Sequence, residues 1–298
     1  MKTVILGASG FIGQNLLQSN DSTIALSLRD PLWRAGLQDA EVIINLVGKA
    51  HDHDATATEN DFYVANVDCA KLVFESFIAS EAKLLIHVSS IAALEEFEAS
   101  VALKEDEASR PVSWYGQSKR AAEVWLMQQE IPSDKKLIIL RPPMVHGPGD
   151  KGNLGLLYKL ISKGIPYPLT AYNNSRSFIS IDNLRYFVKL IILKHNQLDS
   201  GIYHVSDDEP VATADIINLI KKVTGKNSKN LSLPKFLVNG LAKLGDYVPI
   251  PLNTKRLKKM TSDLLVSNQK IRTALGIDKL PLTAEEGLEI TIKSFNQQ

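Results

Sequence analysis

The stretch Thr3-Val-Ile-Leu-Gly7-Ala-Ser-Gly10-Phe-Ile-Gly13 decides the fold of this chain. It combines a short apolar strand, a glycine turn and the start of a helix. Gly7 suits a tight turn, Gly10 lets the backbone approach a pyrophosphate, and Gly13 lets the helix pack closely on the sheet. The helix N-terminus then offers unpaired N–H groups to phosphate oxygens. Because the motif follows a strand and opens a helix, it predicts a dinucleotide-binding turn.

Short aliphatic strands alternate with amphipathic helices through the first two-thirds of the chain. Most strand candidates are continuous apolar runs, as expected for strands buried on both faces of a parallel sheet. Helices are expected between them near 11–19, 60–79 and 114–129, so the alternation predicts an α/β fold with a doubly wound parallel sheet, the Rossmann arrangement. The strand candidates are Thr3–Leu6, Thr23–Leu28, Glu41–Leu46, Lys83–Val88, Leu137–Leu140 and Ile202–Val205.

The character of the chain changes after about residue 146. Glycines and prolines gather around one expected helix, Leu154–Lys163, and the last third shows little strand signal. The later helices are expected near 213–224, 234–245 and 284–296. We therefore predict two domains: a Rossmann domain of 1–146 plus about 178–205, and a smaller, mainly helical C-terminal substrate domain of 147–177 plus 206–298.

Composition narrows the class of protein. The chain has 298 residues, 44% of them hydrophobic and 22% charged, as in an ordinary soluble globular protein. Its 34 basic and 33 acidic residues give a net charge of +1, so the overall balance makes no electrostatic case for nucleic acid or an anionic membrane. No apolar run approaches the ~20 residues of a transmembrane helix, and no signal peptide is evident. With Cys69 as the single cysteine, we expect a cytoplasmic protein.

Tyr115-Gly-Gln-Ser-Lys119 places a phenol and an ammonium on one face of an expected helix, one turn apart. A free tyrosine has a pKa near ~10 and is a poor base at neutral pH. Lowering that pKa by about three units takes roughly 4 kcal/mol, which a nearby lysine and a cationic cofactor ring could supply. The pair is therefore a candidate general acid/base, and the alternative is a solvated helix face.

The end of the second strand, Leu28-Arg29-Asp30, should read the adenosine ribose. Asp30 could accept a hydrogen bond from a ribose 2′-hydroxyl, which implies NAD, and Arg29 could pair with a 2′-phosphate, which implies NADP. Both stand side by side, so NAD and NADP remain open. Pro31 follows directly, and a plain turn is a further interpretation of Asp30.

Together these residues resemble the extended short-chain dehydrogenase/reductases, and more closely the NAD-dependent epimerase/dehydratase family that acts on nucleotide sugars. The resemblance covers nearly the whole chain. It rests on the glycine motif, on Ser89-Ser90 after a central strand and on the Tyr115/Lys119 pair. It is extended by Asn66 and by further segments at Arg141–Gly149, Arg176–Asp182 and Ser267–Gly276.

The resemblance implies roles for single residues. Tyr115 is the catalytic acid/base, Lys119 binds the nicotinamide ribose and lowers the pKa of Tyr115, and Ser90 hydrogen-bonds the reacting sugar oxygen. The residues implied to bind the cofactor are Gly7, Gly10, Phe11, Ile12, Gly13, Arg29, Asp30, Leu46, Asn66, Tyr115 and Lys119. Those implied to bind substrate are Lys49, Ser90, Asn153, Arg176 and Arg256. No metal is expected, although His51 and His53 lie two residues apart in a loop.

The family implies chemistry at C4 of a nucleotide sugar. We expect an epimerase of UDP-glucose or UDP-N-acetylglucosamine type that serves surface polysaccharide precursors. One alternative is a 4-ketoreductase of a UDP-4-keto-6-deoxy-hexose, and another is a non-enzymatic NAD(P)-sensing protein. Ile91-Ala92 after Ser90 replaces the acidic pair of 4,6-dehydratases, so dehydration is not expected. The short interval before Glu41–Leu46 resembles the reductases. Helices 60–79 and 114–129 pair in dimers of many relatives, so a homodimer is possible.

Overall fold

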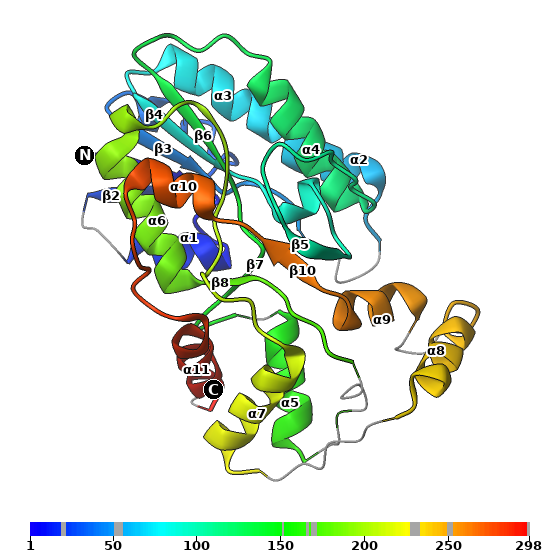
Figure 1. Cartoon of the computed structure of the whole chain (residues 1–298). Helices are drawn as coiled ribbons and strands as arrows, with labels where there is room; N and C mark the ends of the chain where they lie inside the picture. The colour runs from blue at the N-terminus through cyan, green and yellow to red at the C-terminus, as the bar shows by residue number, and fades with distance from the viewer. Residues whose placement is uncertain are drawn as a thin grey trace.

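Figure 1 shows the chain as a computed structural model. It describes residues 1–18, 22–50, 56–150, 152–164, 167, 172–226, 233–248 and 253–296, and within these ranges it leaves the side chains of Asn153 and Arg256 undescribed.

Six parallel strands form the central sheet, in the order β2-β1-β3-β4-β6-β9. The chain moves from β1 to β2 on one side and then crosses β1 to reach β3 on the other. The gap between β1 and β3 is therefore the topological switch point, where ligands of such sheets bind. This arrangement confirms the predicted Rossmann fold. The strands are β1 (Thr3–Leu6), β2 (Thr23–Leu26), β3 (Val42–Asn45), β4 (Leu84–Val88), β6 (Lys136–Arg141) and β9 (Gly201–His204).

Successive side chains of the central strands point to opposite faces of the sheet, and each face has its own core. Ile5 lies in the first core, and its neighbours Val4 and Leu6 lie in the second. The same alternation holds in β3, β4 and β6, which explains their continuous apolar sequences. The first core is covered by α1 (Phe11–Leu17), α6 (Ile181–Lys194) and α10 (Gln269–Leu275), and the second by α3 (Cys69–Ala79) and α4 (Trp114–Met127).

The second strand departs from the expectation of full burial. β2 ends at Leu26 rather than Leu28, and Ile24 and Ala25 are exposed. The cause is the short interval before β3, which holds one turn of 3₁₀ helix, Ala35–Leu37, and no strand. Without a further strand beside it, β2 forms the edge of the sheet.

Two small parallel sheets were not predicted. β5 (Ala99–Leu103) pairs with β10 (Leu264–Val266), and β7 (Met144–His146) pairs with β8 (Phe178–Ser180). Each joins segments that are far apart in the sequence. Both lie between the Rossmann sheet and the second lobe (Figure 1).

The second lobe is helical, as predicted, and has a separate apolar core. One boundary differs from the prediction: α10, which lies in the segment 206–298 assigned to the substrate domain, packs on the Rossmann sheet through Ile271 and Leu275. No described helix is long and apolar enough to cross a membrane. The lobe contains α5 (Asn153–Ser162), α7 (Thr213–Thr224), α8 (Lys235–Leu244), α9 (Thr254–Thr261) and α11 (Ala284–Phe295).

The predicted long helix at 60–79 consists of three parts. α2 (Glu59–Tyr63) begins with a capping box between Thr58 and Asp61. A π-helical turn, Val64–Asp68, follows, and α3 continues from it. Single π-helical turns inside α-helices occur frequently at functional sites. This one contains Asn66, one of the predicted cofactor residues.

Candidate active site

The three motif glycines have different roles in the glycine turn. Gly7 adopts φ +83°, and a Cβ there would lie 2.8 Å from the carbonyl carbon of Leu46. A Cβ on Gly13 would lie 2.5 Å from Cα of Ala8. Gly7 and Gly13 are thus required by the protein's own packing at the switch point. A Cβ on Gly10, by contrast, would meet only the Gly7 carbonyl oxygen, at 3.6 Å.

Among the described residues, nothing therefore crowds Gly10 at the N-terminus of α1, where its backbone has φ −76° and ψ 169°. We expect Gly10→Ala to leave the free energy of unfolding nearly unchanged while weakening NAD affinity at least about tenfold, because the methyl group enters the space expected for the pyrophosphate. In Gly13→Ala, overpacking should lower the free energy of unfolding by about 1–3 kcal/mol. Urea denaturation measures the free energy of unfolding, and calorimetric titration measures the affinity for NAD. A Gly10→Ala variant that is destabilised but binds NAD as wild type does would contradict the assignment of Gly10 to the cofactor and of Gly13 to packing.

The helix that carries Tyr115 is fixed at its first turn. Ser113 caps α4 by accepting a hydrogen bond from the Gly116 amide at 3.0 Å. The buried carboxylate of Glu96 holds this cap, accepting from the amides of Val112 and Ser113 at 3.0 and 2.7 Å and from the Ser113 hydroxyl at 2.8 Å. Glu96 was missed in the sequence because its partners lie 16 and 17 residues away. It orients the turn from which Tyr115 projects.

Two further tethers join α4 to the end of β4. The Lys119 ammonium is buried and donates to the Val88 carbonyl oxygen at 2.9 Å. The Ser89 hydroxyl donates to the buried Glu123 carboxylate at 2.6 Å. Ser89 and Glu123 are therefore structural partners that fix the strand end next to Ser90. Tyr115, Lys119 and Glu123 are spaced four residues apart, so the sequence predicts that they share one helix face. The sequence does not show that Glu123 accepts a hydrogen bond from Ser89.

Ser90 and Tyr115 come together through these tethers. The Ser90 side chain hydrogen-bonds Tyr115 and thereby lowers the pKa of its phenol, but burial is the larger effect and raises that pKa above its ordinary value. Glu96 and Glu123 raise the pKa of Tyr115 further. The predicted lowering of this pKa by Lys119 together with a cationic cofactor ring stays a prediction. Burial of the phenol, together with two carboxylates, outweighs the contribution of the protein's own donors.

Burial also lowers the pKa of Lys119 to about 8, against the opposing effect of Glu123. Between pH 8 and the ordinary value of 10.5, the unfolded chain binds more protons than the folded one, so Lys119 makes the free energy of unfolding rise with pH across this window. The total rise is roughly 3 kcal/mol. We expect Lys119→Met to lack this contribution. Urea denaturation of wild type and Lys119→Met at pH 8 and pH 10 gives the rise in the free energy of unfolding for each protein. The other titrating groups contribute equally to both rises, so the difference between them is the contribution of Lys119. Equal rises in the two proteins would contradict the assignment.

Asn66 links the π-helical turn to both sides of the site. Its amide nitrogen donates to the Ser118 hydroxyl at 2.8 Å and to the Lys49 carbonyl at 3.0 Å, and its oxygen accepts from the Lys49 amide at 2.9 Å. A Cβ on Gly48 would collide with this oxygen and lie 3.2 Å from the Lys119 ammonium. The loop after β3 thus passes directly beside Lys119, at the switch point of the sheet.

The other predicted cofactor residues divide between packing and surface roles. Phe11 and Ile12 pack partly buried against the first core, as does Leu46, whose backbone contacts Gly7. The Asp30 carboxylate accepts from the Leu32 amide at 2.9 Å, which is the turn considered as an alternative interpretation. Arg29 is exposed, and no ion pair to its guanidinium occurs among the described residues.

The predicted substrate residues lie in different environments. The Lys49 ammonium lies over the Phe62 ring, 5.7 Å from its centroid, and interacts with Asp61, so it contacts α2. Arg176 lies at the junction of the lobes. Its backbone exchanges two hydrogen bonds with the backbone of Val211, and its guanidinium donates to the Ser262 carbonyl oxygen at 3.0 Å. Asn153 begins α5 and Arg256 lies in α9, but their side chains are outside the description, as are the loop residues His51 and His53.

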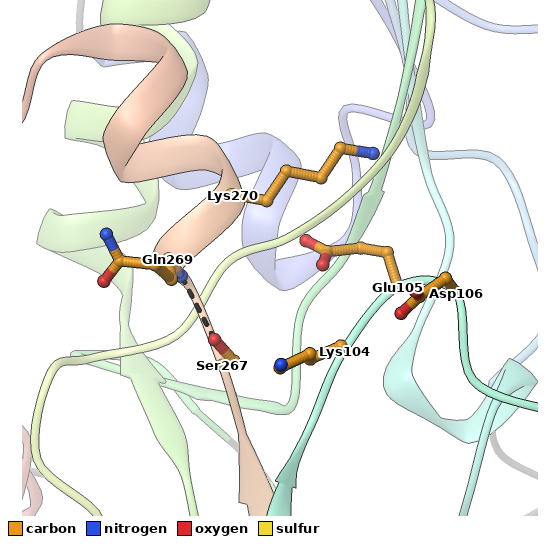
Figure 2. Close-up of a pocket in the computed structure, with 6 residues that line it drawn as sticks. All are labelled: Lys104, Glu105, Asp106, Ser267, Gln269 and Lys270. Atoms are coloured by element: carbon orange, nitrogen blue, oxygen red, sulfur yellow. Dashed lines mark hydrogen bonds between the residues drawn. The ribbon is translucent and has the colours of Figure 1, made fainter.

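A pocket of about 370 Å³ lies between the segment after β5 and the start of α10. Figure 2 shows Lys104, Glu105 and Asp106 on one side of it and Ser267, Gln269 and Lys270 on the other. The Lys270 ammonium is engaged by the Ile202 carbonyl at 2.7 Å and by the Tyr203 ring. None of the predicted site residues lines this pocket, and no cluster that could hold a metal ion occurs within the described ranges. The catalytic candidates are therefore grouped elsewhere, at the end of β4.

The chain is similar to known proteins of one family. The model of the NAD dependent epimerase/dehydratase family matches residues 22–206. A UDP-glucose 4-epimerase of Vibrio cholerae is 29% identical over 99% of this chain and 96% of its own length. An Escherichia coli O157:H7 N-acetyl-alpha-D-glucosaminyl-diphospho-ditrans,octacis-undecaprenol 4-epimerase is 22% identical over 97% and 94%.

Among solved structures, the UDP-glucuronic acid 4-epimerase of Bacillus cereus in complex with NAD has the same fold, with a TM-score of 0.77 at 18% identity over 100% of this chain and 99% of that one. The chain belongs to the NAD-dependent epimerase/dehydratase family. The two relatives reported above are both named as 4-epimerases, one of UDP-glucose and one of an undecaprenol diphosphate that carries N-acetylglucosamine.

Proposed function

We propose that the protein is an NAD-dependent 4-epimerase of a UDP-hexose, either UDP-glucose or UDP-N-acetylglucosamine. The observation that carries the proposal is the convergence of Ser90, Tyr115 and Lys119 at the end of β4, held there by the bonds from Lys119 to Val88 and from Ser89 to Glu123. An NAD(P)-sensing protein without catalytic activity would not need a tyrosine and a lysine positioned in this way.

In this proposal the Tyr115 phenolate accepts the proton of the C4 hydroxyl and returns it to the same oxygen after the 4-keto sugar has turned, so that the hydride is added to the opposite face of C4. The Ser90 hydroxyl donates to the same oxygen and holds it in place as charge develops. NAD, when bound, takes up the C4 hydride and gives it back. Since the protein alone raises the pKa of Tyr115, the phenolate requires added positive charge near Lys119, which couples proton removal to the presence of the oxidised cofactor.

The residues present fit a dinucleotide. Gly10 leaves open space at the N-terminus of α1, and Gly7 forms the turn beside Leu46. We infer that Gly10 approaches the pyrophosphate and that Lys119, beside Gly48, contacts the nicotinamide ribose. The Asp30 carboxylate already accepts a hydrogen bond from the Leu32 amide in its own turn. We therefore infer that the exposed Arg29 contributes as much as Asp30 to the discrimination between NAD and NADP.

Arg176 is the best-placed cation for a diphosphate in this nearly neutral chain. Burial lowers the pKa of its guanidinium, and Asp263 acts in the opposite direction. A desolvated guanidinium at the lobe junction suits a phosphate oxygen better than a solvated lysine does, because its hydrogen bonds are formed in a medium of low dielectric. We infer that it contacts the UDP moiety.

Dehydration is not part of the proposal. The Glu95 carboxylate accepts from the amides of Glu96 and Phe97, both at 2.9 Å, and so bends back on its own turn. The two positions directly after Ser90 are Ile91 and Ala92. Neither can transfer the protons that water elimination requires.

A 4-ketoreductase is the second candidate, and the missing strand beside β2 favours it together with the exposed Arg29. The two reactions share their catalytic residues, so only substrates separate them. Purified protein is incubated with UDP-glucose and UDP-N-acetylglucosamine without added cofactor, and the sugars are followed by NMR. Conversion to the galacto forms supports the epimerase. Oxidation of NADPH with a UDP-4-keto-6-deoxy sugar, without conversion, supports the reductase and overturns the proposal.

A further inference from the structure

A lysine of the second lobe reaches the carboxylate that holds the start of the catalytic helix. Lys259 lies on α9, and its ammonium is 3.6 Å from Oε2 of Glu96. It also lies over the Phe97 ring, 5.2 Å from the centroid. The side chain of Lys259 is 46% exposed and that of Glu96 only 3%, so the cation reaches from the surface to a buried carboxylate. This pair joins the two lobes beside the candidate active site.

The backbone that carries Lys259 is fixed on both sides. Leu257, one turn of chain before it, lies in the apolar core of the second lobe. After α9 the chain runs directly into β10, which pairs with β5 of the Rossmann domain (Figure 1). Between α9 and β10, the carbonyl oxygen of Ser262 accepts a hydrogen bond from the Arg176 guanidinium at 3.0 Å. The ammonium of Lys259 is therefore presented to the Rossmann domain by a well-anchored helix.

Glu96 uses a different oxygen for each lobe. Oε1 accepts the hydrogen bonds that hold the Ser113 cap of α4, and it is so close to that helix that a Cβ on Gly116 would lie 2.5 Å from it. Oε2 faces Lys259. Within the described parts of the chain, Glu96 has no ion pair other than this one. Lys259 is therefore the countercharge of a carboxylate that is otherwise buried against α4.

The charge of Glu96 acts on Tyr115. Burial is the main cause of the raised pKa of Tyr115, and the carboxylates of Glu96 and Glu123 raise this pKa further. Glu123 is compensated within the Rossmann domain, by Arg141 at 2.7 Å. Glu96 is compensated from the other lobe, by Lys259. The remaining groups near the phenol or near these carboxylates are the Ser90 hydroxyl, Arg120, which pairs with Glu123, and Lys119, one turn along α4.

We propose that Lys259 is a positioning residue for catalysis, which acts from the second lobe by holding and neutralising Glu96 beside the start of α4. The inference rests on the proposed function, in which Tyr115 carries the proton. Without Lys259 the negative charge of Glu96 is uncompensated, so the phenolate of Tyr115 forms only at higher pH. The second lobe thus contributes to a proton transfer that none of its own residues carries out.

The test is Lys259→Met at saturating NAD. Ionisation of Tyr115 is followed through the ultraviolet absorbance of tyrosinate, after subtraction of the curve for Tyr115→Phe. We expect the midpoint to rise by about half a pH unit, because solvent partly screens the lost cation. Turnover of the UDP-sugar at pH 7 should fall about threefold, which is the same shift expressed as a fraction of phenolate. KM should change little, since Lys259 acts through Glu96 rather than on the substrate.

Lys258→Met is the matched control. Lys258 lies on the same helix but pairs with Glu98, at 3.0 Å, so its loss should change neither the titration nor turnover. Glu96→Gln keeps an oxygen for the Ser113 cap and removes the charge, so the midpoint of Tyr115 should fall. Adding Lys259→Met to Glu96→Gln should then have no further effect, because the charge that Lys259 neutralises is gone. Thermal unfolding confirms that each variant folds.

An unchanged Tyr115 titration in Lys259→Met would overturn the inference, as would an equal upward shift in the Glu96→Gln background. A higher KM with an unchanged titration would assign Lys259 to substrate contact and also overturn it. Wild-type protein that converts no UDP-sugar would contradict the proposed function instead. In that case the tyrosinate titration still decides whether Lys259 acts on Tyr115, so the two failures are distinguished.

Discussion

Tyr115→Phe is expected to reduce turnover of the UDP-sugar by about 10³-fold, within the range that general acid/base catalysis contributes. The substitution removes the hydroxyl that exchanges the proton with the C4 oxygen, while the ring and the tethers around Lys119 and Glu123 remain. Binding of NAD should change little. Initial rates measured by coupled assay, together with calorimetric titration of NAD, check both parts of this expectation.

Tyr186→Phe is the matched control, since Tyr186 lies on α6 at the opposite face of the sheet and packs against the first core. It should keep wild-type turnover. If Tyr115→Phe retained turnover close to that of Tyr186→Phe, the phenol would not be the proton carrier, and the candidate site would have to be assigned elsewhere.

Glu123→Ala should lower the free energy of unfolding by about 3–5 kcal/mol, because it leaves a buried guanidinium without its carboxylate. Arg141 is 1% exposed and donates to both Glu123 oxygens, from Nε at 2.8 Å and from Nη2 at 2.7 Å. The same substitution frees the Ser89 hydroxyl and loosens the strand end before Ser90. Activity should therefore fall together with stability. Thermal and urea denaturation measure the first effect, and turnover below the melting range measures the second.

Glu289→Ala is the control for a surface ion pair. Glu289 pairs with Lys293 at 2.6 Å on the exposed side of α11, where solvent screens the charges. Its removal should leave the midpoint of unfolding nearly unchanged. Equal effects of Glu123→Ala and Glu289→Ala would show that the Arg141 pair does not hold α4 to the sheet.

The parts of the fold that could be predicted are those encoded by neighbouring residues. The continuous apolar run Val4–Leu6 and the glycines that follow it specify the first βα unit, which the structure contains. The pairing of Ala99–Leu103 with Leu264–Val266 could not be predicted, because each strand is short and its partner lies more than 150 residues away. α10 was assigned to the wrong lobe for a similar reason: Ile271 and Leu275 show an apolar stripe but not which core it joins.

In the candidate site, too, only features encoded by neighbouring residues could be predicted. Tyr115 and Lys119 could be found from their spacing, but Glu96 could not, since its partners at Val112 and Ser113 are brought to it by a loop. Burial, which raises the pKa of Tyr115, could not be predicted either, because it is a property of the folded chain.

The central claim is that the hydride removed from C4 returns to the same sugar. The most direct measurement uses UDP-glucose and UDP-N-acetylglucosamine carrying deuterium at C4, incubated with purified protein without added cofactor and followed by proton NMR. We expect at least one of them to give its galacto form with deuterium retained at C4. No galacto product from protein that holds NAD(P), or a product whose C4 deuterium has been lost, would contradict the account.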